Sequence, residues 1–203
     1  MSSVALQEWQ GTRSVQLDEL DAAHGAVGGI GPGRRYATRQ LNHAYAVVLA
    51  AQFQGFCRDL HSESADMVAG ALGFAGSTNR SAVADLVLTA LTKSRQLDRG
   101  NANPGSIGTD FKGFDLDIWD AARQLHVRTQ GRLRRLEQLN VWRNAVAHQD
   151  FDFEPHELEV LGDMRTIDLR QVRAFRSCCD RLAATFDEVL ARHLKPIVGR
   201  RPW

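Results

Sequence analysis

The sequence carries almost no net charge, which limits how it can bind other molecules. Its 203 residues include 25 Lys and Arg against 24 Asp and Glu, so the formal net charge is +1. A protein that binds a polyanion through a broad electrostatic surface usually has a larger excess of positive charge. Any such contact must therefore come from a local patch of basic residues.

Long hydrophobic runs are absent as well. The longest apolar stretch covers residues 44–51, far fewer than the ~18 residues that a membrane-spanning helix needs. The first residues, MSSVALQEW, lack the basic flank and the apolar stretch of a secretion signal. We therefore expect a cytoplasmic location and no contact with a membrane.

Cysteine is scarce, and its spacing predicts neither disulfides nor a metal site. Cys178 and Cys179 are adjacent, and adjacent cysteines bridge only with strain, so we expect free thiols near the core in a reducing compartment. Cys57 and His61 lie one helical turn apart, but no further ligand follows at metal-site spacing. We favour a structural role for this pair and expect neither a metal nor a cofactor.

No segment alternates apolar and polar residues over enough positions to predict a sheet. Residues 157–161 are the only short candidate, and they fit a helical turn equally well. Apolar residues instead recur at steps of three and four, which indicates an all-α fold, an antiparallel bundle of four to five helices. We expect helices over 13–27, 35–72 and 81–97, from Asp115 or Asp117 to Ala147, and from Asp168 onward.

Glycine and proline mark the expected connections. Turns are predicted at 28–33 and 73–79, and an irregular stretch at 151–164. Residues 99–113, rich in Gly, Asn and Pro, are interpreted as a surface loop without the Gly-Lys-Ser/Thr of a phosphate-binding P-loop. The organisation that follows is an N-terminal helical segment with a Gly-rich turn (1–33), which covers the bundle or contacts a partner, a helical bundle (34–198) and a frayed tail (199–203).

The last helix has the clearest signals. Asp168 is followed three residues later by Gln171, which is the spacing of a capping box. Apolar residues then recur at alternating steps of three and four, as in the seam of a helical bundle. These residues are Val172, Phe175, Cys179, Leu182, Phe186 and Val189.

The helix predicted to end near Ala147 is rich in arginine. Between Arg123 and Arg143 the only acidic residue is Glu137, and the arginines are Arg123, Arg128, Arg132, Arg134, Arg135 and Arg143. They form either a solvated surface or a track for a polyanion backbone, whose binding would depend strongly on salt. Arg143 continues the apolar stripe of Leu136 and Leu139, and an unpaired charge facing a core or an interface is costly. A carboxylate, a partner chain or a phosphate must therefore compensate for it.

Residues 141–148 read Val-Trp-Arg-Asn-Ala-Val-Ala-His and resemble the signature of the HEPN superfamily. In that signature an Arg, commonly followed directly by Asn, precedes a His by four to six residues near the end of a helix. The stretch YAVVLAAQFQGFCRDL at 45–60 also resembles the first core helix of bacterial members of the RiboL-PSP and MAE-like types. The resemblance covers roughly residues 35–195. Many members carry an acidic residue in the middle of that helix, where this chain has Gln52 or Gln54.

The superfamily consists of small helical bundles, many of them ribonucleases of toxin–antitoxin, phage-defence and RNA-processing systems. The resemblance implies a metal-independent endoribonuclease with Arg143 and His148 as the catalytic pair and Asn144 in support. In such a reaction the ribose 2′-hydroxyl attacks the adjacent phosphorus, an imidazole exchanges a proton, and a guanidinium stabilises the charged phosphorane. The implied partners are RNA, a second copy of the chain and a cognate antitoxin or defence-system protein.

Helix geometry bears on the number of chains at the site. Arg143 and His148 are separated by about 140° around an ideal helix, so one small site holds both only if the helix ends or bends between them. Two protomers could instead pool two arginines and two histidines in one cleft. Other readings remain open: two basic residues that suit a helix C-terminus, a catalytically inactive HEPN-like module that binds nucleotide, RNA or protein, and a scaffold assembled through its last helix.

Overall fold

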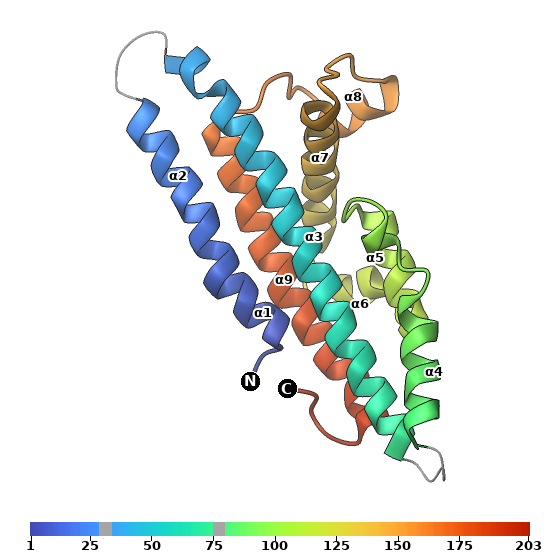
Figure 1. Ribbon diagram of the computed structural model, residues 1–203. Helices are drawn as coiled ribbons and strands as arrows, with labels where there is room; N and C mark the ends of the chain where they lie inside the picture. Colours follow the sequence, from blue (N-terminus) through green and yellow to red (C-terminus); the bar gives the residue numbers. More distant parts are fainter. Residues whose placement is uncertain (29–33, 75–79) are drawn as a thin grey trace.

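The computed structural model describes residues 1–28, 34–74 and 80–203 (Figure 1). Every regular element in these ranges is helical, which confirms the all-α prediction. The α-helices, labelled as in Figure 1, are α1 (Val4–Glu8), α2 (Ser14–Gly28), α3 (Arg34–Phe74), α4 (Arg80–Thr92), α5 (Pro104–Phe111), α6 (Ile118–Leu125), α7 (Thr129–His148), α8 (Pro155–Leu161) and α9 (Leu169–Val198). A π-helical turn, Trp9–Arg13, joins α1 to α2, and short 3-10 turns occur at Gln96–Asp98 and Lys112–Phe114.

The long helix α3 is the axis of the molecule. Helices α2, α4, α7 and α9 pack against it, and the short helices α5 and α6 lie beside α7. In Figure 1, α9 runs in the same direction as α3, whereas α2 and α7 run in the opposite direction. The expected antiparallel arrangement therefore holds for α2–α3, α3–α7 and α7–α9 but not for α3–α9. Within the described ranges, no helix combines the length and the apolar character that a membrane span requires.

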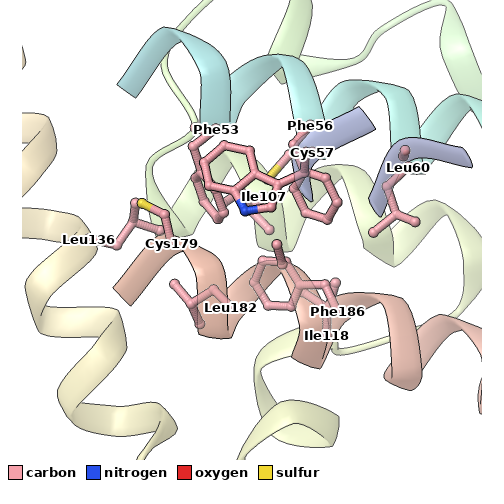
Figure 2. Close-up of a cluster of buried hydrophobic side chains, with 14 of the residues drawn as sticks. Phe53, Phe56, Cys57, Leu60, Ile107, Ile118, Leu136, Cys179, Leu182 and Phe186 are labelled. Atoms are coloured by element: carbon pink, nitrogen blue, oxygen red, sulfur yellow. The ribbon is translucent and has the colours of Figure 1, made fainter. Parts of the chain in front are cut away.

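The core lies between α3 and α9. Figure 2 shows Phe53 and Phe56 of α3 opposite Leu182 and Phe186 of α9, and all four side chains are fully buried. Every apolar residue predicted for the seam of the last helix is buried. The predicted capping box at the start of α9 is also formed. The cysteines are free and buried, so the thiol prediction is confirmed for the structure.

The N-terminal segment covers the bundle. Its helix begins at Val4, nine residues before the predicted start, and Trp9 is buried in the common core. Arg13 lies across α3, where its Nη1 atom donates to Gln52 Oε1 at 2.6 Å. Gly55 allows this approach, because a Cβ atom there would lie only 2.6 Å from Arg13 Nη1.

The expectation of a frayed tail is wrong for Trp203, which is buried. Its indole nitrogen donates to Asp187 Oδ2 at 3.2 Å, and Asp187 Oδ1 accepts from the backbone nitrogen of Ser3 at 3.0 Å. One buried carboxylate therefore holds the two ends of the described chain, which lie close together in Figure 1.

The loop expected at 99–113 contains a helix, α5. Asn103 caps it by accepting from the nitrogen of Ser106, and Pro104 occupies the first helical position. Asparagine at the cap and proline at the first position both favour a helix start. The Gly-rich composition of 99–113 favours a loop, but these two residues start a helix.

Other boundaries differ as well. The expected fourth helix is two helices, because α6 ends at Leu125 and α7 begins at Thr129; Asp117, not Asp115, caps α6. The irregular stretch expected at 151–164 contains α8, so the candidate strand is helical. Helix α4 ends at Thr92, before the predicted end. The expected glycine-rich turns lie largely outside the described residues.

Candidate functional site

Arg143, Asn144 and His148 line one depression of about 450 Å³, which we call the Arg143 pocket. Its lining residues are Gln54, Asp98, Arg99, Gly100, Asn101, Arg143, Asn144 and His148. They come from the middle of α3, the end of α7 and the segment that leads into α5. A larger depression of about 660 Å³, between the end of α3 and residues 196–202, contains none of them and offers no histidine or cysteine.

The end of α7 positions the histidine. His148 is the last residue of the helix, and Gln149 then adopts a left-handed φ of 54°. The nitrogen of Asp150 donates to the oxygen of Ala145 at 3.0 Å, which satisfies one of the last helical carbonyls. As a result the His148 side chain is exposed at the helix terminus.

A single chain brings Arg143 and His148 to the same pocket. The expected requirement that the helix end or bend between them is wrong, because α7 is continuous through His148. Asn144 follows Arg143 by 100° around the helix axis and precedes His148 by about 40°. The pocket extends over this arc, and all three side chains line it.

One oxygen atom of Asn144 accepts hydrogen bonds from two side chains and orients Arg143. The Oδ1 atom of Asn144 accepts from Arg143 Nη1 at 3.2 Å and from Asn101 Nδ2 at 2.6 Å. Because this oxygen is occupied twice, only the amide nitrogen of Asn144 remains to interact with a ligand, and it donates. Asn144 therefore presents a donor to the pocket.

The segment 96–102 lines the pocket beside α3 and α7, and we call it the second wall. Hydrogen bonds from side chains of three helices hold it in place. Asp110 of α5 accepts from the backbone nitrogens of Gln96 at 2.7 Å and Leu97 at 2.8 Å. Gln54 of α3 donates to the oxygen of Leu97 at 2.8 Å, and Asn140 of α7 donates to the oxygen of Ala102 at 3.2 Å. Since so many side chains hold this backbone, the wall is preorganised.

The pocket has an excess of positive charge. Within the described part of the chain, neither Arg99 nor Arg143 forms an ion pair. The carboxylate of Asp98 is engaged by Arg95, with contacts of 2.9 and 3.0 Å. No carboxylate among the described residues therefore pairs with Arg143, although the sequence allowed for such a partner. An anion in the pocket would meet unpaired guanidinium groups.

Sequence reasoning missed the residues of the second wall. Arg99 and Asn101 lie in the stretch interpreted as a surface loop, and nothing local connects them to α7. Of the two glutamines at the position where many HEPN members have an acid, Gln54 lines the pocket, whereas Gln52 faces Arg13 on the other side. The helical period could have separated the two, since residues two apart lie about 200° apart.

The other arginines of α6 and α7 lie away from the pocket. Arg123 pairs with Asp120 at 2.6 Å, and Arg134 donates to the oxygen of Glu159 at 3.4 Å. Arg135 and Asn144 are nine positions apart, so they leave α7 on opposite sides. A track for a polyanion along this arginine-rich face remains a prediction and is not an extension of the pocket.

Cys57 and His61 pack in the core, as expected for residues with a structural role. Both are buried, and the His61 ring packs against Phe111 and Phe114 with centroid distances of 5.4 and 4.8 Å. Burial, helped by the charge of Arg95, lowers the pKa of His61 to about 4. The described residues contain no group of three His, Cys, Asp or Glu side chains placed to hold a metal ion.

The pocket thus combines a fixed guanidinium, an amide donor and an exposed imidazole, which suit the binding of a phosphate group and proton exchange with it. Comparisons with protein-family models, with curated proteins and with solved structures found no match for this chain.

Proposed function

We propose that the protein is a metal-independent endoribonuclease of toxin or phage-defence type with a HEPN-like helical bundle. The observation that carries this proposal is that Arg143, Asn144 and His148, the residues of the HEPN-like signature, line one positively charged pocket. The sequence resemblance and the pocket support the same assignment, because the resemblance names the residues and the fold brings them together.

In the proposed reaction each of these side chains has its own role. The ribose 2′-hydroxyl attacks the adjacent phosphorus, the bond from phosphorus to the 5′ oxygen breaks, and the products are a 2′,3′-cyclic phosphate and a 5′-hydroxyl. Arg143 stabilises the charge that develops on the phosphorane oxygens. The amide nitrogen of Asn144 donates to the same phosphate group. His148 accepts the proton of the attacking hydroxyl.

The proton balance favours a homodimer. One proton leaves the 2′-hydroxyl and another must reach the departing 5′ oxygen, whereas the described residues of one chain contribute a single histidine to the pocket. His148 is exposed at the end of α7, so a second copy packed against this end adds its own imidazole as the acid. A cognate antitoxin or defence-system protein would act by covering the same surface.

The test is cleavage of total cellular RNA in excess EDTA. We expect the wild-type protein to produce fragments with 2′,3′-cyclic phosphate ends. Arg143→Ala and His148→Ala should lower the rate at least a hundredfold, because each removes a group that acts on the transition state. His156→Ala is the control, since this exposed histidine lies on α8 and not in the pocket.

Intact RNA with a folded wild-type dimer would reject the nuclease. RNA binding that weakens in Arg143→Ala would then favour the second reading, a catalytically inactive HEPN-like binding module. That reading rests on the same observation, because an unpaired guanidinium beside an amide donor binds phosphate whether or not a bond is cleaved.

A further inference from the structure

The second wall of the Arg143 pocket carries a cation that the HEPN-like signature does not contain. Arg99 follows the short 3-10 turn Gln96–Asp98 and lines the pocket together with Arg143. Its side chain is exposed, and it has no ion pair among the described residues. The acid next to it, Asp98, is neutralised by Arg95 through two contacts.

The backbone beneath Arg99 is held more firmly than an ordinary surface loop. The buried carboxylate of Asp110 accepts two backbone N–H groups at the start of the segment, and the amides of Gln54 and Asn140 donate to its carbonyls. Asn101, two residues further on, is tied to Asn144 at 2.6 Å. This anchoring lowers the entropic cost of placing the guanidinium on a ligand.

We propose that Arg99 binds a second phosphate, the one adjacent to the phosphodiester that Arg143 holds, so that the substrate class is an oligonucleotide with at least two consecutive phosphodiesters. This inference rests on the proposed function. Two unpaired guanidiniums in one depression of about 450 Å³ suit two neighbouring anionic groups better than a single one. A nucleotide with one phosphate would leave Arg99 unused.

The test compares substrates that differ by one phosphate. Wild type, Arg99→Gln and Arg99→Lys are assayed on a ribodinucleotide with one phosphodiester and on trinucleotides extended at either end. The control is Arg170→Gln, at an exposed position of α9 outside the pocket. We expect the better trinucleotide to exceed the dinucleotide about tenfold in kcat/KM with wild type, as for a charge-assisted hydrogen bond. Arg99→Gln should abolish this advantage, so that the dinucleotide and the trinucleotides have a similar kcat/KM. Arg99→Lys should keep part of the advantage, and Arg170→Gln all of it.

Binding of 2′-O-methyl versions of the same oligonucleotides gives a readout that needs no cleavage. The expected result is a Kd about tenfold lower for the trinucleotide, lost in Arg99→Gln alone. An equal advantage in wild type and Arg99→Gln, or no advantage in wild type, overturns the inference. Absence of cleavage with the binding pattern intact would instead reject only the nuclease, so the two failures are distinguishable.

Discussion

The side chain of Asn101 donates to Asn144 Oδ1 at 2.6 Å, and the same oxygen accepts from Arg143 Nη1 at 3.2 Å. A residue 42 positions upstream of Arg143 thereby orients its guanidinium through an intermediate amide. Asn101 itself lines the pocket wall, so it acts as a positioning residue in the proposed reaction.

Asn101→Ala should therefore lower kcat about tenfold and change KM less than about twofold. The amide of Asn144 loses its fixed orientation, and the guanidinium spends less time in the geometry that stabilises the transition state. Steady-state cleavage of a short RNA measures both constants. Asn103→Ser is the matched control, because serine keeps the cap of α5 and does not contact Asn144. An equal loss in the control would mean that the segment is only structural.

The stability of the protein should fall as the pH falls through the range of histidine titration. The pKa of His61 is lowered from 6.5 to about 4 by burial and by Arg95. The unfolded chain therefore binds more protons than the folded one between these values, and stability is full above pH 6.5 and lost toward pH 4. This difference in pKa corresponds to about 3 kcal/mol at the acidic limit.

His61→Phe should remove most of this contribution, which urea unfolding at pH 7 and pH 5 measures. Between these pH values wild type should lose about 2 kcal/mol more than the variant. His156→Gln, at an exposed position, should behave as wild type. A pH dependence that is the same in wild type and His61→Phe would contradict a buried neutral imidazole.

The thiols should not react in the native state. Burial raises the pKa of Cys178 to about 12 and raises those of Cys57 and Cys179 well above the ordinary range, so almost no thiolate exists at pH 8. We expect negligible modification by a chromogenic disulfide in buffer and three modified thiols per chain in guanidinium chloride. Rapid labelling of the folded protein would show that the core between α3 and α9 opens.

Phe53→Ala should destabilise the fold by about 3–5 kcal/mol, because it leaves a cavity in the tightly packed core. Phe53 is fully buried and packs against Trp9, Phe56 and Phe186 with ring-centroid distances of 5.7, 5.9 and 6.5 Å. Val127→Ala, at a position that is 93% exposed, should change the free energy of unfolding by less than about 0.5 kcal/mol. Urea denaturation with unchanged m-values measures both. A loss below about 1 kcal/mol for Phe53→Ala would contradict this packing.

Signals confined to one helical turn were the most reliable in the sequence. Asp168 and Gln171 form the predicted capping box, since both residues belong to the same turn. The cap of α5 at Asn103 and Pro104 is of the same kind, but the Gly-rich composition around it favours a loop. Residues 126–128, between α6 and α7, include no glycine or proline, so the sequence does not predict this break. There Thr129 is buried and its hydroxyl donates to the oxygen of Ala122 at 2.9 Å, a contact that forms only when the two helices meet.

The sequence by itself determined that the chain is helical, where its longest helices lie and that Arg143, Asn144 and His148 share the end of one of them. This is because helical hydrogen bonds and side-chain spacing depend on residues three and four positions apart. Only the tertiary structure decided that Gln54, Arg99 and Asn101 face the same pocket. These residues are 42 to 89 positions from Arg143 along the chain, and their meeting depends on how α3, α5 and α7 pack, which no local pattern specifies.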